Sequence, residues 1–334
     1  MSIDVKRADE SELEKWDDYV SRSPMGTLFH TDAVLTVLAE HSGATLHRLI
    51  GKKGQEVRGV LPLFEIRKGP VKTLFSPSPQ LGVPNLGPVL VNHEKLKQRK
   101  RERTNRRFVE NSLEWVADEI GPKFVRLETV TDYVDTRPFQ WNEFDVTPRH
   151  TYELDISGGK EAMLSNFKSN LRSDIRRHED ADYRVYEGDE DAIRFIIRQV
   201  RNRYEEQGKT YGIQPEYVID LYRALPEGSV RPYVGEANGE RLGGIIVLEY
   251  GSRCYYWQGG GKPDVPIPIN DLIHWRIIRD AFDRDIETYD LTGANTRRIS
   301  RYKSKFNPDL VPYYALERGT RTMNIVSDVY RKLK

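Results

Sequence analysis

The residues best suited to chemistry gather late in the chain, between Arg253 and Phe306. A short strand is predicted there over Thr288–Leu291, and it is followed by Gly293. A strand that ends in a loop of small residues is a common position for a substrate. The next segment, which begins at Arg297, is basic and carries aromatic residues. Such a segment suits an anionic ligand, although most basic segments are solvated surface.

An aromatic strand and an apolar helix precede this segment. The strand holds Tyr256 and Trp257 and runs into the glycines 259–261. Asn270 stands where the N-cap of the helix belongs, and the helix is apolar on several sides, which indicates burial. Tyr211, Tyr256 and Trp257 are therefore candidates to line a substrate site. Aromatic side chains in strands belong more often to the core, and that alternative stays open.

Two helices carry concentrated positive charge. In the first, eight basic residues and one acid lie between Lys95 and Arg107. In the second, Lys168, Arg172 and Arg176 form a strip of residues about one turn apart, and Arg177 follows Arg176. The first helix could contact RNA or an anionic surface, and Arg172, Arg176 and Arg177 of the second could hold phosphates through forked contacts. A solvated helix face is the alternative for both.

Composition excludes several classes of protein. The 334 residues are 31% charged, yet the net charge is only +1, which argues against a protein that coats nucleic acid. A single cysteine, Cys254, excludes an internal disulfide and a cysteine-rich zinc site. The histidines lack metal-ligand spacing, and no phosphate-binding loop, dinucleotide fingerprint or serine elbow is present. We expect no metal site.

Hydropathy bounds the location. No apolar run approaches the length of about 20 residues that spans a membrane, and the N-terminus lacks the apolar part of a signal peptide. We therefore expect a soluble, cytoplasmic protein without stable membrane insertion. We also expect a monomer.

The chain contains a short internal repeat. Leu49–Gly51 precedes a turn and Gly59, and Tyr233–Gly235 precedes a turn and Gly243. The spacing between the two glycines is the same in both copies, which indicates two similar α+β units joined near residue 148. Three segments around these units are predicted as a loop over 68–91, a linker over 132–148 and a strand ending at Gln258. A helix is predicted at the end of the chain, through Met323, Val326, Tyr330 and Leu333.

Several segments together resemble the FemAB family, a branch of the GCN5-related N-acetyltransferase (GNAT) superfamily. They span nearly the whole chain: Leu28–His30, Phe167–Arg177, Gly243–Ile246, Tyr255–Trp257, Asn270–Trp275, Tyr289–Gly293 and Ile299–Lys303. The resemblance implies an α+β fold of two tandem GNAT-like subdomains, each a mixed, mostly antiparallel sheet flanked by helices. They would cover residues 1–148 and 149–310, with residues 311–334 returning to the first.

The resemblance also implies a reaction and its residues. FemAB-like enzymes transfer an aminoacyl or acyl group to an amine, and characterised members use aminoacyl-tRNA and a peptidoglycan precursor. Tyr302 and Lys303 stand where the family has Phe-Lys, whose lysine lies at the reaction centre. Glu128 stands where an acidic residue ends a strand of the first subdomain. We expect three catalytic residues, Lys303, Glu128 and Asp290. We expect the substrates to be bound by Arg172, Arg176, Arg177, Tyr211, Tyr256, Trp257, Asn270, Tyr302 and Lys305.

Aminolysis of an ester or thioester makes modest demands. The amine must be neutral and aligned with the carbonyl, and alignment contributes up to about 7–11 kcal/mol. One donor to the developing oxyanion adds about 3 kcal/mol. Lys303 would be that cationic stabiliser, near the carbonyl or a donor phosphate, and Glu128 or Asp290 would accept the amine proton. Asp290 is equally explained as a residue that caps the end of its strand.

The donor and the acceptor stay open. Aminoacyl-tRNA is the favoured donor, because Gln258–Pro263 departs from the Gln/Arg-x-x-Gly-x-Gly/Ala pattern that holds coenzyme A, although acyl-CoA stays an alternative. No bound cofactor is expected. The predicted helix Thr31–Ser42 lacks the lysine with which the wall enzymes hold a nucleotide sugar, so the acceptor is left as a small-molecule or peptide amine. A non-catalytic RNA- or partner-binding module that uses Lys95–Arg107 is the remaining alternative.

Overall fold

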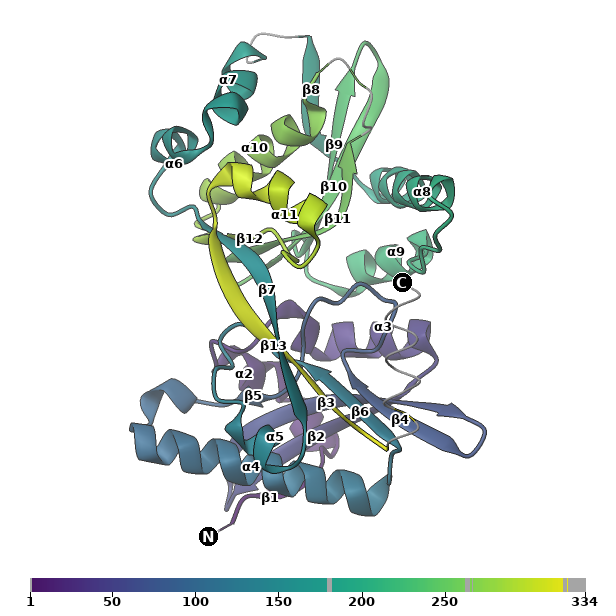
Figure 1. Cartoon of the computed structure of the whole chain (residues 1–334), viewed down its shortest axis with the longest axis vertical. Coiled ribbons are helices and arrows are strands. Elements are labelled where there is room, and N and C mark those ends of the chain that lie inside the picture. Colours follow the sequence, from purple (N-terminus) through teal and green to yellow (C-terminus); the bar gives the residue numbers. More distant parts are fainter. Residues whose placement is uncertain (1, 179–181, 262–264, 266, 321–322, 324–334) are drawn as a thin grey trace. The chain divides into compact units, whose positions relative to one another are not determined.

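The computed structural model describes residues 2–178, 182–261, 265, 267–320 and 323. The chain divides into two compact units, unit 1 with Met1–Arg149 and Pro312–Lys334, and unit 2 with His150–Val311 (Figure 1). Each unit is a mixed, mostly antiparallel sheet flanked by helices, which confirms the predicted fold class. Apart from Met323, the helix predicted at the end of the chain lies outside the described residues.

Unit 1 is built on a sheet with the strand order β1-β2-β3-β4-β6-β13, and β5 pairs with β3. The strands are β1 (Asp4–Arg7), β2 (Thr45–Lys53), β3 (Glu56–Lys68), β4 (Val71–Ser76), β5 (Val89–Leu90), β6 (Phe124–Glu128) and β13 (Asp309–Gly319). Neighbouring strands are antiparallel except β4 and β6, which are parallel. The last strand, β13, joins β6 and so brings the end of the described chain back into unit 1.

The helices of unit 1 cover both faces of its sheet (Figure 1). They are α1 (Glu10–Leu13), α2 (Trp16–Ser21), α3 (Asp32–Ser42), α4 (Gln98–Glu119) and α5 (Arg137–Trp141), with short 3-10 turns η1 (Leu28–His30) and η2 (His93–Lys95). The second half of α4 supplies Phe108, Val109, Leu113 and Val116 to the core, at the helical spacing that its sequence predicts. The first half of α4 is the basic segment.

Unit 2 repeats the plan with the strand order β7-β12-β11-β10-β9-β8. The strands are β7 (Asp145–Asp155), β8 (Tyr183–Glu187), β9 (Val230–Ala237), β10 (Glu240–Tyr250), β11 (Arg253–Gly261) and β12 (Thr288–Asp290). The helices are α6 (Lys160–Asn166), α7 (Ser169–Arg177), α8 (Glu190–Glu206), α9 (Pro215–Ala224), α10 (Ile269–Phe282) and α11 (Arg297–Lys303), and α11 continues into η3 (Ser304–Phe306). Only β11 and β12 are parallel neighbours among these described strands.

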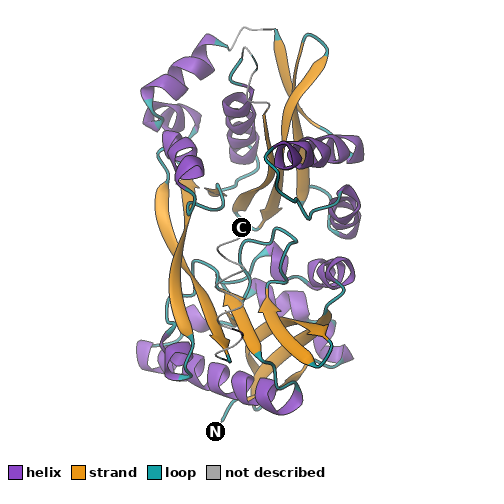
Figure 2. Ribbon diagram, turned by 45° about the vertical axis from the view of Figure 1, so that its right-hand side comes forward, coloured by secondary structure: helices purple, strands orange, loops and turns teal. Residues whose placement is uncertain are grey.

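The two faces of the unit 2 sheet carry different helices. Helices α6, α7 and α10 lie on one face, and α8 and α9 lie on the other, as Figures 1 and 2 both show. The core on the α10 face includes Ile273, Ile277 and Ile278 of α10 and the buried Cys254 of β11. Since α10 is buried on several sides, its position against the sheet is fixed by apolar packing.

The repeated glycines explain how each unit packs its central helix. Gly51 pairs with Gly59 across the first hairpin, and Gly235 pairs with Gly243 across the second. A Cβ atom on Gly51 would lie 2.5 Å from the Phe108 ring of α4, and one on Gly235 would lie 2.5 Å from Ile269 of α10. The glycines therefore let α4 and α10 approach the equivalent hairpin closely.

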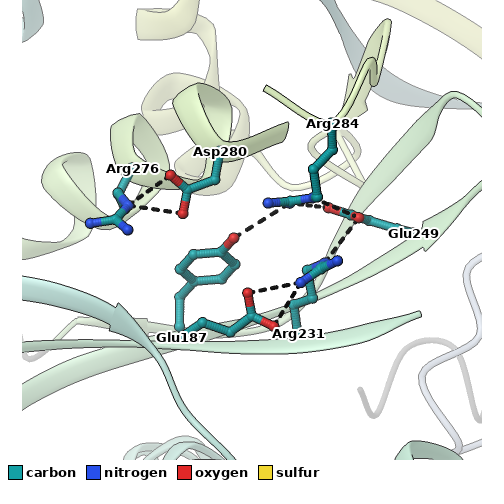
Figure 3. A network of polar contacts seen from close by, with 7 residues as sticks. Glu187, Arg231, Glu249, Arg276, Asp280 and Arg284 are labelled. Atoms are coloured by element: carbon teal, nitrogen blue, oxygen red, sulfur yellow. Dashed lines mark hydrogen bonds and ion pairs between the residues drawn. The ribbon is translucent and has the colours of Figure 1, made fainter. Parts of the chain in front are cut away.

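A charged network fixes the far end of α10 to the sheet (Figure 3). Arg231 of β9 contacts Glu187 of β8 at 2.8 Å and Glu249 of β10 at 3.0 Å. Glu249 also accepts a hydrogen bond of 3.1 Å from Nε of Arg284, just beyond α10. Because Glu249 is nearly buried and bonded to two guanidinium groups, the network is a structural connection between the helix and three strands.

Three predicted boundaries are wrong. The segment 68–91 is not one loop, because Gly69 and Pro70 form a hairpin turn between β3 and β4. The segment 132–148 is not a linker, because it contains α5 and the start of β7. The aromatic strand does not end at Gln258, because it continues through the glycines to Gly261 in pairing with β10. In the first and third cases the prediction ends regular structure at glycine or proline, whereas here these residues permit a tight turn or close strand pairing. In the second case, Pro138 lies in the first turn of α5, where proline is tolerated.

Candidate active site

The parallel strands of unit 2 separate at a defined point. β11 and β12 pair through Arg253–Tyr255 and Thr288–Asp290, after which β12 ends and β11 continues to Gly261. We call this point the strand fork of unit 2. The residues that follow on both strands no longer pair with each other as a ladder in the described part of the chain. Beyond this point, Asn270 of α10 bonds to the Gly261 N–H, and Lys303 of α11 bonds to the carbonyl oxygens that follow β12.

Asp290 and Thr292 form the base of the fork. The buried Asp290 carboxylate accepts hydrogen bonds from Thr151 Oγ1 at 2.6 Å and from the Thr292 backbone N–H at 2.7 Å. Thr292 has a φ of 46°, which is rare for a β-branched residue and strains the backbone. Its hydroxyl donates to the Tyr256 carbonyl, which also holds the turn in place. Burial raises the pKa of Asp290 to about 6.

Lys303 reaches this turn from the last residue of α11. Its ammonium group donates to the carbonyl oxygens of Thr292 and of Gly293, the latter at 3.2 Å. The nitrogen also lies 5.0 Å from the centre of the Tyr256 ring, within cation–π range. Burial lowers the pKa of Lys303 to about 8, although the charge of Asp290 opposes that shift. The lysine therefore changes its charge close to neutral pH, as a group that transfers protons should.

A neutral histidine lies behind Lys303. His274 of α10 is fully buried, with its Nδ1 at 2.9 Å from the Tyr289 hydroxyl and its ring 4.9 Å from the Tyr256 ring. Burial and, after it, the charge of Lys303 lower the pKa of His274 to about 3. His274 is therefore uncharged at neutral pH, and Lys303 is the cation that faces Tyr256.

Tyr302 and Lys305 anchor the lysine segment instead of extending from it. The Tyr302 hydroxyl donates to Asp271 Oδ1 at 2.7 Å, and Lys305 Nζ lies 2.8 Å from Asp271 Oδ2. Asp271 is buried in the first turn of α10. The two side chains thus tie the residues on both sides of Lys303 to α10. The prediction of Asn270 as the N-cap of α10 is wrong, because Pro268 occupies that position. The Asn270 side chain instead accepts a hydrogen bond of 3.0 Å from the Gly261 N–H.

The far side of the fork is lined by β11 and the elements around α8. Tyr211 donates a hydrogen bond of 2.6 Å to the Gln258 side chain, and Arg203 of α8 donates one of 3.1 Å to the Gly261 carbonyl. Gly259 has a φ of 120°, and a Cβ atom there would lie 2.2 Å from the Gly244 carbonyl oxygen. A side chain is therefore excluded from this part of the strand, which leaves the backbone near Tyr256 bare.

Tyr256 and Trp257 point to opposite faces of the sheet. Tyr256 lies with Lys303 on the α10 face, whereas Trp257 packs against Tyr217 of α9, with ring centres 5.9 Å apart. Adjacent residues in a strand alternate in this way. Tyr256 therefore lies close to Lys303, whereas Trp257 lies on the opposite face of the sheet from Lys303.

The basic helix α7 is connected to the lysine segment. The Lys168 N–H donates to the Lys305 carbonyl at 2.9 Å, and the Phe167 and Phe306 rings are 5.4 Å apart. Arg172 is partly occupied by a hydrogen bond of 2.8 Å to the Ser165 carbonyl. Arg176 and Arg177 are exposed and have no acidic partner among the described residues. Of the three arginines predicted to bind phosphate, Arg176 and Arg177 are therefore the two whose side chains are exposed and not hydrogen-bonded to a described carboxylate.

Glu128 belongs to unit 1, at the end of β6. Its Oε1 accepts a hydrogen bond of 3.1 Å from Arg126 Nε, and Arg126 also contacts Glu317. Its role as a base stays a prediction. A surface hollow of about 440 Å³ also lies in unit 1, lined by Lys15, Tyr19 and Arg22 among others, and it contains none of the predicted site residues.

Sequence reasoning missed two residues that shape the fork, Thr292 and His274. The dipeptide Thr292–Gly293 signals a turn, but a threonine gives no sign that it will adopt a positive φ. His274 follows an apolar run in α10, and the only available signal was a polar residue on an otherwise buried helix. Thr292 bonds to both Lys303 and the Tyr256 backbone, whereas His274 packs against the Tyr256 ring.

Comparison with known proteins assigns this region to a family. Residues 165–304 match the acetyltransferase (GNAT) domain family, from the end of α6 to just beyond Lys303. Unit 2 contains a GNAT acetyltransferase domain. The chain is thus a GNAT-fold acyltransferase, and the strand fork and Lys303 lie inside the matched GNAT domain. No curated protein sequence matches the chain.

Solved structures share the fold over the full chain. A crystal structure of FemX has a TM-score of 0.70 at 13% identity and covers 93% of this chain and 96% of its own. L-PGS from Bacillus licheniformis has a TM-score of 0.57 at 12% identity, with 98% of both chains covered. A tandem GNAT protein from the clavulanic acid biosynthesis pathway has a TM-score of 0.53 at 11% identity and covers 95% of this chain and 97% of its own. At these identities the likeness shows the fold alone.

Neither a membrane-spanning helix nor a metal site is found among the described residues. No described helix combines the length and the apolar character needed to cross a bilayer. No group of three or more His, Cys, Asp or Glu side chains in the described part of the chain is arranged to hold a metal ion.

Proposed function

We propose that this protein transfers an aminoacyl or acyl group from an activated ester or thioester to an amine, at the strand fork of unit 2. The observation that carries the proposal is Lys303. A buried lysine with a lowered pKa, held by two carbonyl oxygens in a strained turn, is costly to maintain for structure alone. Its place inside a GNAT domain supports acyl transfer.

Lys303 would act on the charge that develops during the reaction. The amine nitrogen attacks the carbonyl carbon, the C–N bond forms, and the C–O or C–S bond of the donor breaks. The amine loses one proton, and the departing oxygen or sulfur gains one. Protonated Lys303 would stabilise the oxyanion and the leaving group, and its pKa of about 8 lets it pass a proton to that group.

Asp290 supports this reaction as a positioning residue in our proposal. Both hydrogen bonds to its carboxylate come from the protein, from Thr151 and from Thr292. The second fixes the turn whose carbonyl oxygen holds Lys303. The alternative, in which Asp290 or Glu128 accepts the amine proton, requires a substrate amine within hydrogen-bond reach of one of these carboxylates.

Aminoacyl-tRNA is the donor that we favour. The exposed Arg176 and Arg177 would bind its phosphates, next to the segment that carries Lys303. The name of a lysylphosphatidylglycerol synthetase among the proteins of similar fold indicates aminoacyl transfer for that protein, which supports the same class here. Acyl-CoA is the second candidate donor. The structure of the tandem GNAT protein of similar fold is named as the one without acetyl-CoA, and this name associates acetyl-CoA with that protein. In either case the donor is a co-substrate, and we propose no resident cofactor.

The acceptor is proposed as a small-molecule or peptide amine. Helix α3 (Asp32–Ser42) contains no lysine, the residue with which related wall enzymes would hold a nucleotide sugar. A peptidoglycan precursor is therefore the less favoured acceptor. We propose a monomer located in the cytoplasm.

One experiment distinguishes the donors. The purified protein is incubated with charged tRNA or with an acyl-CoA mixture, each with a pool of amines, and the products are analysed by mass spectrometry. We expect an amide product with charged tRNA that the Lys303→Ala variant does not form. An amide formed only from acyl-CoA would replace the favoured donor by the second one. Absence of any amide product, with both donors shown to bind, would refute the proposed reaction.

A further inference from the structure

The first half of α4 presents a surface that the proposed reaction does not use. We call it the basic face, and it consists of Lys97, the N-cap residue, and of Arg99, Lys100 and Arg103 in the helix. All four side chains are exposed and have no acidic partner among the described residues. The acid within this half, Glu102, is already paired with Arg137 at 3.0 Å. The positive charge of the basic face is therefore not neutralised by the described part of unit 1.

The position of these cations in the helix is unfavourable for unit 1 alone. α4 begins at Gln98, and its first turn contains no acidic residue. The N-terminal end of a helix carries a partial positive charge, so cations there reduce helix stability and anions increase it. A row of arginine and lysine at this end is explained if an external anion binds to it.

Two exposed apolar side chains lie on segments that contact the first half of α4. Val134 is 75% exposed and Trp141 is 60% exposed, and they are the exposed large hydrophobic side chains among the described residues of unit 1. Asn105 of α4 holds the Val134 loop by hydrogen bonds to Tyr133 and to the Asp135 carbonyl, at 2.6 and 2.7 Å. The segment of Trp141 is held to α4 by the ion pair between Arg137 and Glu102.

The environment of Trp141 resembles that of an interfacial anchor. The Arg137 guanidinium lies 5.8 Å from the centre of the Trp141 ring and also pairs with Asp135 at 2.7 Å and with Glu102 at 3.0 Å, so the ring lies beside an ion-paired arginine. Tryptophan near basic residues is the pattern found where proteins contact lipid headgroups. An exposed tryptophan could also stack on a nucleic acid base, but the exposed aliphatic side chain of Val134 has no role in such a contact.

We propose that the basic face of α4, with Val134 and Trp141, docks unit 1 on an anionic phospholipid surface. The cations bind lipid phosphates, and the two apolar side chains enter the headgroup region. This docking is peripheral and needs no membrane-spanning helix. It does not depend on the proposed reaction, because no residue of unit 2 takes part.

Vesicle co-sedimentation of the full chain tests the proposal. The probes are phosphatidylcholine vesicles with and without about one third phosphatidylglycerol. We expect binding to the anionic vesicles only, weakened by salt. Removing one cation near an anionic surface weakens binding about fivefold, so Arg99→Gln/Lys100→Gln/Arg103→Gln should weaken it about a hundredfold. The matched control Lys53→Gln/Lys68→Gln/Lys123→Gln removes the same charge from exposed positions elsewhere in unit 1 and should bind like the wild type.

A second readout separates docking from general charge attraction. Subtracting the emission spectrum of Trp141→Phe from that of the wild type isolates the emission of Trp141. This emission should shift to shorter wavelength when anionic vesicles are added. Val134→Ser/Trp141→Ser should weaken vesicle binding and leave its salt dependence intact. Circular dichroism and thermal melting confirm that each variant is folded. Equal losses in both triple variants, no fluorescence shift, or binding of single-stranded RNA in place of vesicles would each overturn the proposal.

Discussion

The two units share a plan and differ where their parallel strands end. In unit 1, β4 and β6 pair from Thr73 to Ser76, and the chain then returns to the same place. Leu86 bridges to Thr129, its N–H donates to the Glu128 carbonyl at 2.8 Å, and the Gly87 N–H donates to the Ser76 hydroxyl at 3.0 Å. The equivalent fork of unit 1 is therefore filled by its own loop. In unit 2, the fork is lined by Tyr256, Thr292 and Lys303 instead.

We interpret this difference as that between a scaffold and a candidate site. The unit 1 loop satisfies its backbone groups with other backbone groups and with a serine, and it buries Leu86 completely. The unit 2 turn satisfies its backbone groups with a lysine, a buried carboxylate and a threonine in a strained conformation. Strain and buried charge persist where the surrounding structure supports them, and they gather at functional sites. We infer that the duplicated fold kept chemistry in one copy.

Removing the Lys303 side chain should have the largest effect on this contrast. Lys303→Ala deletes the cation of the unit 2 fork, and loss of one such stabilising group lowers kcat by about 10²–10³-fold. The measurement is the rate of amide formation under donor saturation, with thermal melting to show that the fold persists.

The control for this variant is Lys160→Ala. It removes a lysine of the same unit that pairs with Asp283 at the surface, and it should leave kcat unchanged. A folded Lys303→Ala enzyme with normal kcat would show that the fork of unit 2 is no more catalytic than the fork of unit 1.

A matched pair of leucine variants tests the contrast from the other side. Leu86→Ala in unit 1 removes a fully buried side chain and should lower the free energy of unfolding by about 2–5 kcal/mol, with kcat per folded molecule unchanged. Leu291→Ala removes an equally buried leucine between Asp290 and Thr292, and it should lower both stability and kcat. Denaturant unfolding and rate measurements decide. A loss of kcat in Leu86→Ala as large as in Leu291→Ala would contradict the assignment of unit 1 as scaffold.

The duplication was predictable from the sequence, but the ends of its strands were not. Gly51 and Gly235 mark equivalent hairpin positions because a helix crosses each at a distance that no side chain allows. That constraint is local, so it leaves a pattern in the sequence. Gly69 forms a turn, whereas Gly259–Gly261 pair with a neighbouring strand. Which of these two roles a glycine takes depends on strand partners and not on its local sequence.

The candidate site was predictable only in part for the same reason. Lys303, Tyr256 and Asp290 were predicted, and the structure brings them together around Thr292. Alternation along the strand would have placed Trp257 on the opposite face from Tyr256, and that rule could have been applied to the sequence. The anchoring of Tyr302 and Lys305 to Asp271 depends on how α11 meets α10, which no local pattern encodes.

Replacing Asp290 should change how stability depends on pH. The folded pKa of about 6 lies above the ordinary value of 3.8, so the folded state binds a proton more tightly than the unfolded state. The contribution of Asp290 to stability therefore falls as pH rises from about 4 to about 6, by about 3 kcal/mol. The unfolding free energy of the wild type minus that of Asp290→Asn, measured by urea titration, should fall by that amount over this range. A constant difference would place the carboxylate in contact with solvent and remove its role in holding Thr292.

The smallest expected effect concerns the exposed arginines of α7. Arg176→Gln/Arg177→Gln removes two cations that have no acidic partner among the described residues and that lie on the helix joined to the Lys303 segment. Exposed contacts contribute about 0.2–1 kcal/mol each, so KM for a phosphate-bearing donor should rise about fivefold while kcat stays constant. Arg198→Gln, at an exposed position of α8, is the matched control and should leave KM unchanged. Leu86 belongs to unit 1, which is the scaffold in this comparison. Adding Leu86→Ala to the double variant should therefore leave the KM of that variant unchanged. If Arg198→Gln raised KM as much as the double variant, donor binding would follow the overall charge of unit 2 and not the helix beside its fork.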